Sequence, residues 1–334
     1  MSKVKRINGH GHEVLDFRDT PDGFLGLVSK YIHKNLHKRS EQLQKWLNAF
    51  SYLVPGDKLR YLSQYLDTLD NTDEERMEYN LQFFDMVFCY CVDLHYMGAG
   101  KCTRDYDDQI AAAVHLKKRN PGRVKIFMML DPNRPNLMEL VKKWHTHIDG
   151  WKLYPTWYYV TDIRLRPIFN AYPKPVVVHC TNTSPVYFQG SRNALKRKLG
   201  ENAHRYKALK SKKWNCQFFS HPSYVYEMSI RYPNINWSCE HMGGSDKVWQ
   251  DYILERLGGN FYTGDAFTFT TDEEIKQLVP IVEEHPNIMH GTDYFMTLVK
   301  GEYIEQIRSY NMYMPQRLKR KQVESALRFI GEEE

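Results

Sequence analysis

Two histidines one residue apart, His10 and His12, follow the first apolar stretch of the chain. In a β-strand, residues i and i+2 point to the same side, so these two imidazoles can reach one metal ion. Imidazole is a good ligand for zinc, iron, copper and nickel. A pair of this kind is weak evidence by itself, and its weight depends on other polar residues that are placed in the same way along the chain.

Further polar residues lie at the ends of predicted strands. Lys152 lies near the end of the fourth predicted strand, His179 ends the fifth, His241 follows the sixth and Asp293 follows the eighth. In a closed parallel barrel, the carboxyl ends of all strands converge on one mouth. Three imidazoles and one carboxylate, with an open position for water, are typical of a catalytic metal site. We expect Zn²⁺ there, with Mn²⁺ or Fe²⁺ as alternatives that the ligand types do not separate.

The elements that must position these residues alternate along the chain. Continuous short apolar runs suit parallel strands that are covered on both faces. Eight such runs span 4–8, 86–92, 124–130, 150–154, 175–179, 236–240, 260–263 and 287–290. Helices are predicted at 105–119, 134–147, 162–171, 222–232, 245–257, 272–283 and 317–330. This alternation predicts an α/β fold, a (β/α)8 TIM barrel.

Two long insertions interrupt the alternation within one domain that spans residues 1–334. Residues 14–75 follow the first strand and are predicted to be largely helical, whereas residues 181–219 follow the fifth strand and are strongly basic. Both emerge at the face where a barrel of this kind carries its active site. The basic insertion is either a solvated helical face or a lid that attracts an anionic substrate or contacts a partner subunit.

Composition narrows the function class. The net charge of +6 permits an anionic substrate. It does not require nucleic acid, which we do not expect as a partner. No run of about 18 apolar residues predicts a membrane span, and the first residues lack the apolar segment of a signal peptide. The six cysteines show no paired metal spacing, and a reducing cytoplasm is the simplest expectation.

Several motifs occur in an order that resembles a known family. They are Gly-Trp-Lys-Leu-Tyr-Pro at 150–155, Asp-Ile-Arg-Leu-Arg-Pro at 162–167, Pro-Val-Val-Val-His at 175–179, Glu-His-Met-Gly-Gly at 240–244 and Gly-Thr-Asp-Tyr at 291–294. The chain resembles the amidohydrolase superfamily, in particular its branch of amidohydrolase-related proteins and of aminocarboxymuconate-semialdehyde and resorcylate decarboxylases.

The resemblance implies a role for each matching residue. His10, His12, His179 and Asp293 match metal ligands, Asp293 can also hold the attacking water, and His241 matches a histidine that acts as acid or base. The chain departs from the resorcylate subtype because residue 8 is asparagine, where that subtype has a glutamate ligand. The 39-residue insertion after the fifth strand is also longer than the family pattern.

Lys152 and His221 are candidate substrate-binding residues. Lys152 could bind a substrate carboxylate, could be carbamylated and bridge two metals as in binuclear relatives, or could be structural. His221 precedes Pro222 at a predicted helix start on the mouth side of the barrel, where it has either a pocket role or no chemistry.

We therefore expect a metal-dependent hydrolase in which activated water attacks an amide, lactone or related carbonyl of a small, anionic substrate. A metal-dependent, non-oxidative decarboxylase of a small carboxylic acid is the alternative, since it would use the same ligands. A barrel without chemistry that serves in binding or assembly is a third reading. The resemblance also makes a homodimer a candidate assembly.

Overall fold

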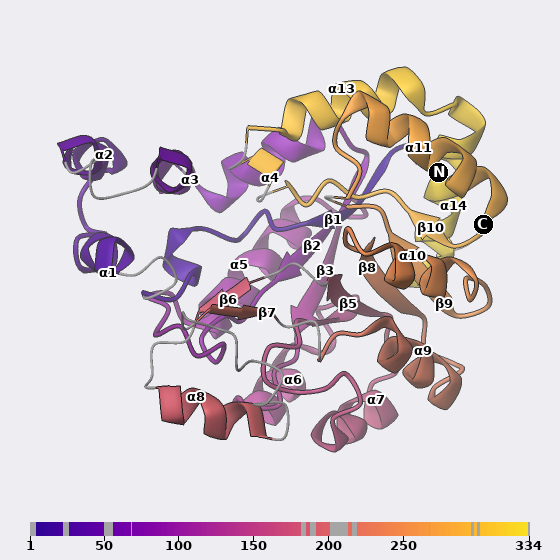
Figure 1. Ribbon diagram of the computed structural model, residues 1–334, viewed down its shortest axis with the longest axis horizontal. Helices are drawn as coiled ribbons and strands as arrows, with labels where there is room; N and C mark the ends of the chain where they lie inside the picture. Colours follow the sequence, from indigo (N-terminus) through magenta and orange to yellow (C-terminus); the bar gives the residue numbers. More distant parts are fainter. Residues whose placement is uncertain are drawn as a thin grey trace.

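Eight parallel strands form the centre of the protein, which we describe from a computed structural model (Figure 1). The structure describes residues 5–22, 27–49, 56–67, 69–181, 185–187, 192–200, 213–215, 219–266, 268–294, 297–298 and 301–332. The strands, in their order around the sheet, are β1 (Ile7–Gly11), β2 (Met86–Cys91), β3 (Val124–Met129), β4 (Gly150–Leu153), β5 (Val176–Thr181), β8 (Trp237–Gly243), β9 (Phe261–Gly264) and β10 (Ile288–Met289).

Two backbone hydrogen bonds join the last strand to the first. The N–H of Gly9 donates to the carbonyl oxygen of His290 at 2.7 Å, and the N–H of Asp293 donates to that of His10 at 2.9 Å. The predicted (β/α)8 barrel is therefore confirmed, and all eight predicted strands are present.

The first strand lies further along the chain than the sequence predicts, at Ile7–Gly11 instead of 4–8. Its glycines permit this placement, because a Cβ at Gly9 would lie only 2.8 Å from the carbonyl oxygen of His290. A glycine here marks close approach of two backbones and not the end of a strand. His10 is consequently part of β1, and His12 follows it directly.

Helices pack around the barrel and follow their strands in sequence. The structure has α5 (Tyr106–Arg119), α6 (Leu137–Trp144), α7 (Arg166–Ala171), α9 (Pro222–Arg231), α10 (Lys247–Leu254), α11 (Asp272–Glu284) and α14 (Gln316–Ile330), each within a predicted range or one residue of it. An additional helix, α13 (Tyr303–Tyr313), was not predicted. Its buried face includes Gln306 and Ser309, so its apolar periodicity is weak.

Alternation along the strands separates two apolar layers. Phe88, Phe127 and Tyr262 belong to the cluster inside the barrel, whereas neighbouring strand residues pack outward against the helices. Phe329 of α14 contacts the inner cluster, with ring centroids 5.3 Å from Tyr262 and 6.1 Å from Phe127. Helix α14 thus covers one end of the barrel, and the polar residues gather toward the other end.

The first insertion is helical, as predicted. It contains α1 (Leu27–Lys34), α2 (Ser40–Ala49), α3 (Gly56–Asp67) and α4 (Asp73–Leu81), and α1 to α3 lie beside the barrel with a small apolar core of their own (Figure 1). Arg104, which precedes α5, pairs with Asp19 and Asp73 and so ties the start and end of this insertion to the barrel.

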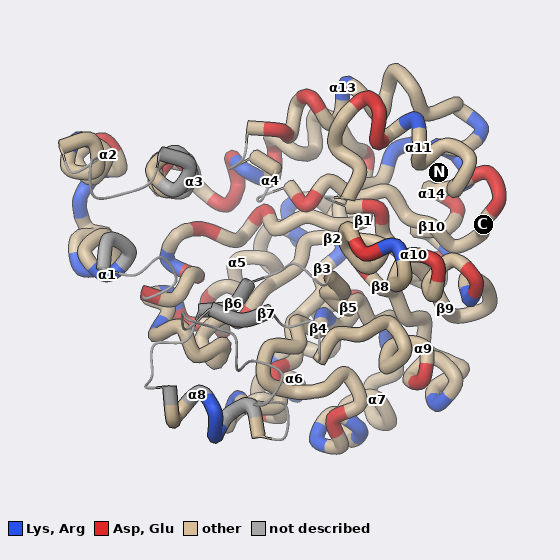
Figure 2. The backbone as a smooth tube through the Cα atoms, viewed as in Figure 1, with Lys and Arg blue, Asp and Glu red and all other residues tan. Residues whose placement is uncertain are grey.

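Only part of the basic second insertion lies within the described residues. Strands β6 (Pro185–Tyr187) and β7 (Lys213–Asn215) form an antiparallel pair, and α8 (Arg192–Leu199) exposes Lys196 and Arg197 (Figure 2). The prediction of a lid or partner surface over 181–219 otherwise falls outside the described residues. No described helix combines the length and the apolar character needed to cross a bilayer.

Candidate metal centre

His10 and His12 each turn one ring nitrogen toward the protein and the other toward Asp293. The Nδ1 of His10 lies 2.7 Å from Oε2 of Glu240, and the Nδ1 of His12 lies 3.1 Å from the carbonyl oxygen of Tyr90. These acceptors favour a proton on Nδ1 of each ring, which leaves the lone pair of Nε2 available to a metal. The two Nε2 atoms lie 3.7 Å and 3.5 Å from the same oxygen, Oδ1 of Asp293.

Asp293 is held by the segment that follows β10. Its φ of 53° lies in the left-handed region, which few residues other than glycine adopt and which Asp tolerates better than most. The preceding Thr292 anchors the turn, because its N–H donates to Oδ1 of Asn8 at 2.9 Å and its Oγ1 accepts from Nδ2 of Asn8 at 2.9 Å. Asn8 therefore connects the strand that carries His10 to the turn that carries Asp293.

His241 is also in the left-handed region, with a φ of 61°. Its Nδ1 donates to the carbonyl oxygen of Ala266 at 2.8 Å, and its own carbonyl oxygen accepts from Oγ1 of Thr268 at 2.6 Å. Its Nε2 lies 3.0 Å from Nδ1 of His179 at the end of β5. Backbone strain at His241 and Asp293 is typical of positions where geometry serves a function.

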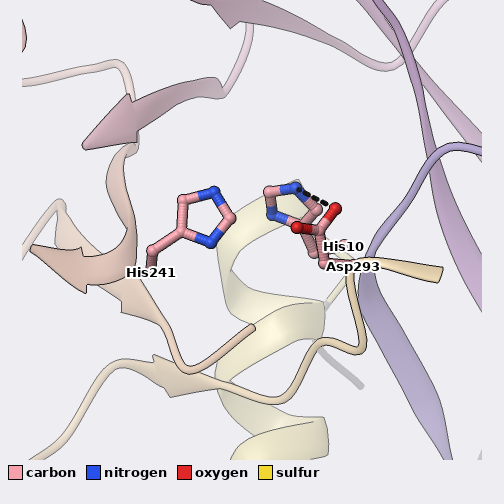
Figure 3. A group of neighbouring side chains, drawn as sticks. All are labelled: His10, His241 and Asp293. Atoms are coloured by element: carbon pink, nitrogen blue, oxygen red, sulfur yellow. Dashed lines mark ion pairs between the residues drawn. The ribbon is translucent and has the colours of Figure 1, made fainter. Parts of the chain in front are cut away.

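Ligand atoms of His10, His241 and Asp293 lie within 4.8 Å of one another, and all three residues are buried (Figure 3). His12 reaches the group through Asp293, whereas His179 reaches it through His241. The four histidines and the aspartate that were predicted as ligands or as the acid–base group thus lie close together. The distances place His241, rather than His179, beside His10 and Asp293.

The donor set suits a divalent cation. Burial lowers the pKa of His12 to about 4 and that of His241 to about 3, so both are neutral near pH 7 and each can offer a lone pair to a cation or to a proton. The Nε2 of His10 is buried and has no hydrogen-bond partner among the described residues. A bare imidazole nitrogen beside a carboxylate and a second imidazole fits a metal ligand set.

Glu240 is a further residue of the site that was not predicted from the sequence. Its carboxylate is buried, contacts His10 and accepts from Oγ of Ser238 at 2.7 Å. Burial raises the pKa of Glu240 to about 7, while the charge of Lys152 acts in the opposite direction. The available signal was a charged residue in an otherwise apolar strand, two residues after a serine and therefore on the same side.

Lys152 projects from β4 and is 1% exposed. Its Nζ lies 4.5 Å from the ring centroid of Tyr90 and has no hydrogen-bond partner among the described residues. Burial lowers the pKa of Lys152 to about 8, although Glu240 and Asp293 raise it in part. A buried ammonium over a tyrosine face, without a hydrogen-bond partner among the described residues, can bind an anionic group.

Five of these side chains line a cavity of about 690 Å³. His12, Lys152, His179, His241 and Asp293 contribute to its lining. Its apolar lining consists of Leu15, Val92, Leu94, Met97, Tyr154, Phe269 and Ile281. The cavity can therefore hold a small molecule with an apolar body and a polar end directed at the histidines.

His221 does not belong to this lining. It is the N-cap of α9, where its Nδ1 lies 3.2 Å from the N–H of Ser223, and its ring packs edge-on against Trp249 at 4.9 Å between centroids. The structure thus places His221 at a helix start, the second of the two readings that its sequence context allowed.

Solved structures with the same architecture include a 5-carboxyvanillate decarboxylase from Novosphingobium aromaticivorans, with bound manganese and 3-methoxy-4-hydroxy-5-nitrobenzoic acid. It is 12% identical, covers 98% of this chain and 97% of its own, and has a TM-score of 0.56. A uronate isomerase from Bacillus halodurans is 12% identical, with coverages of 99% and 94% and a TM-score of 0.50. No protein-family model and no curated protein sequence matches the chain. The likeness to these two enzymes shows the fold that the chain shares with them.

Proposed function

We propose that the chain is a metal-dependent hydrolase of the amidohydrolase superfamily that acts on a small anionic substrate. The observation that carries this proposal is that ligand atoms of His10, His241 and Asp293 lie within 4.8 Å of one another, with His241 and Asp293 in the lining of the cavity. His10 and His241 lie on β1 and β8 and Asp293 follows β10, and a barrel brings such strand ends to its catalytic face.

His10, His12, His179 and Asp293 would hold the cation, and His241 would act on substrate or water. A divalent cation bound there supplies a Lewis acid that polarises a substrate oxygen and lowers the pKa of a water molecule. Asp293 can accept a proton from that water. His241, neutral and fixed by Ala266, can accept a proton and return it to the leaving group.

Lys152 would bind the anionic group of the substrate. Its ammonium is buried, lines the cavity and lacks a hydrogen-bond partner among the described residues. A substrate carboxylate would supply that partner and also offset the burial of the charge. The apolar lining would then contact the body of the substrate, which sets the reacting carbonyl against the histidines.

A non-oxidative decarboxylase is the second candidate function. It is favoured by the buried cation of Lys152, which suits a carboxylic acid, and by the likeness in fold to 5-carboxyvanillate decarboxylase over 98% of the chain. The same ligands would orient the substrate, and a protonated group would deliver H⁺ to the carbon that loses CO₂.

Metal analysis tests the part that both candidates share. Protein purified without a chelator or a histidine tag should contain about one equivalent of Zn²⁺, Mn²⁺ or Fe²⁺ per chain. Metal below a tenth of an equivalent, together with no uptake of added Zn²⁺ or Mn²⁺, would contradict the proposal.

Substrate panels then separate the two reactions. The metal-loaded protein is incubated with lactones and amides that carry a carboxylate, and with aromatic and muconate-type acids, while ring opening and CO₂ release are measured. Turnover of a lactone or amide without CO₂ release supports the hydrolase. Release of CO₂ from an acid, without any hydrolysis, would replace it by the decarboxylase.

A further inference from the structure

We propose that Glu240 is a positioning residue of the metal centre, which fixes the proton of His10 on Nδ1 and so presents Nε2 to the cation. The proposal deepens the proposed function and rests on a metal being bound at this site. It assigns a role to a buried carboxylate that belongs to neither the ligand set nor the substrate-binding set.

Geometry carries the first step. The carboxylate Oε2 lies 2.7 Å from Nδ1 of His10, and both side chains are 1% exposed, so no bulk water competes for this contact. The second oxygen, Oε1, accepts from Oγ of Ser238 at 2.7 Å. Each carboxylate oxygen thus has its own partner, which fixes the orientation of the group toward His10.

The neighbouring strand provides space for this carboxylate. Gly264 ends β9 beside β8, and a Cβ at Gly264 would lie 2.2 Å from Oε2 and 2.8 Å from Cδ of Glu240. Any other residue at 264 would therefore displace the carboxylate from its place beside His10. The absence of a side chain at Gly264 thus leaves the space that the carboxylate of Glu240 occupies.

The acceptor of His10 differs from those of the other two histidines with a fixed ring. His12 and His241 each face a neutral backbone carbonyl, of Tyr90 and Ala266 respectively, whereas His10 faces a carboxylate. A carboxylate partner makes the imidazole a stronger electron donor to a metal, and loss of such a partner typically weakens metal affinity about 10- to 100-fold. We infer that His10 is the histidine whose binding strength depends most on its partner.

Three substitutions test this role on the metal-free, full-length protein. Glu240→Gln keeps the size and an acceptor oxygen but removes the charge, Glu240→Leu removes both, and Gly264→Ala displaces an intact carboxylate. Glu227→Gln on the exposed surface of α9 makes the same change of charge elsewhere and is the control. Dissociation constants for Zn²⁺ and Mn²⁺ are measured by competition with a chromophoric chelator.

We expect Zn²⁺ affinity to fall about 10-fold in Glu240→Gln and about 100-fold in Glu240→Leu, with Gly264→Ala between them and the control unchanged. A spectroscopic readout accompanies it. In ¹⁵N NMR of the metal-free protein, His10 should be protonated on Nδ1 in the parent chain, whereas Glu240→Leu should show a mixture of tautomers.

Unchanged metal affinity in both Glu240→Gln and Gly264→Ala, with circular dichroism equal to the parent's, would overturn the positioning role. An unchanged tautomer in Glu240→Leu would overturn it as well, and if that variant does not fold, the Gln and Ala variants decide. A parent protein that binds neither Zn²⁺ nor Mn²⁺ would instead contradict the proposed function, so the two failures are distinguishable.

Discussion

Three histidines of the candidate centre obtain their orientation from different partners on the protein. His10 uses a side-chain carboxylate, whereas His12 and His241 use backbone carbonyls. In each ring Nδ1 faces one of these acceptors, while Nε2 faces Asp293 in His10 and His12 and faces His179 in His241. The Nε2 of His241 lies 3.0 Å from Nδ1 of His179, so the two rings are direct neighbours. Their proposed roles, metal ligand for His179 and acid–base group for His241, are therefore tested by separate substitutions.

Alanine substitutions separate these two roles. We expect His179→Ala to lose most of its bound metal, since it removes a ligand, and His241→Ala to keep its metal but lose turnover by about 100-fold or more, since it removes an acid–base group. Metal content by mass spectrometry and kcat on the identified substrate are the measurements. The opposite pattern would exchange the two assignments, and equal metal loss would make both residues ligands.

Lys152 gives a prediction for pH dependence. Its pKa is lowered to about 8, so the ammonium form is present below that pH and is lost as pH rises above it. If the ammonium binds the substrate carboxylate, kcat/KM should decrease as pH rises through about 8. Lys152→Met, which keeps the length of the chain, should raise KM at pH 7 more than it lowers kcat and should remove this alkaline decrease.

The control for this experiment is Lys247→Met, at the rim of the same cavity. Lys247 is exposed and pairs with Asp251 on α10. Its loss should leave the pH profile in place. An alkaline decrease that persists unchanged in Lys152→Met would assign it to another group and would contradict the substrate-binding role.

At this scale the sequence points to the candidate ligands more directly than to their hydrogen-bond partners. His10, His12 and Asp293 could be selected because each lies at a predicted strand end. Glu240 could not, because its role depends on the approach of β8 to β1 across the barrel interior. His221 shows the converse, since the structure places this histidine at the N-cap of α9 and outside the lining of the cavity.

At the scale of elements, the strand ends and the helices that follow them shape the cavity. Helix α11 contributes Glu274, Gln277 and Ile281 to its lining, and the start of α11 is fixed by a capping box of Thr271 and Glu274. Oε2 of Glu274 accepts from the N–H groups of Thr270 and Thr271, both at 2.9 Å. The cap therefore stabilises both the helix and one wall of the cavity.

Thr271→Ala tests this coupling, with Thr72→Ala as a matched control. Thr72 and Glu75 form the same capping box at the start of α4, which does not contribute to the lining of the cavity among the described residues. Each substitution should lower the free energy of unfolding by about 1 kcal/mol. We expect only Thr271→Ala to raise KM, because only that helix borders the substrate.

Urea unfolding and steady-state kinetics provide the two readouts. A KM that changes equally in both variants would point to a general effect of lost stability. A KM that changes in neither would show that the wall formed by α11 does not depend on its cap.

The elements themselves were largely predictable, because eight apolar runs and the helices between them follow simple periodicities. The exceptions have physical causes. Gly9 lies inside β1, where its backbone closely approaches that of His290, and α13 buries polar side chains such as Gln306, which contacts the loop at Phe269. The ends of the strands also depend on the turns at His241 and Asp293. Their positive φ values could not be predicted from the sequence, because neither residue is glycine.

At the scale of the whole molecule, the centre links the first strand of the chain to the last. Ligand candidates on β1 and after β10 come from opposite ends of the sequence and contact each other directly. A cation shared between them would bind the folded chain and not the unfolded one. Metal should therefore stabilise the whole barrel, by about 4 kcal/mol when the free ion is present at 1,000 times its dissociation constant.

We expect a chelator to lower the melting temperature of the parent protein and added Zn²⁺ or Mn²⁺ to restore it. Asp293→Asn should lose this metal-dependent stabilisation, because the amide is a weaker ligand and His10 and His12 lose the carboxylate that their Nε2 atoms face. Asp246→Asn, at the cap of α10, removes the same charge from a helix start and should keep the full response to metal. Differential scanning calorimetry with and without chelator measures the effect. A melting temperature that responds equally to metal in Asp293→Asn and in the parent would mean that the two ends of the chain do not share a cation.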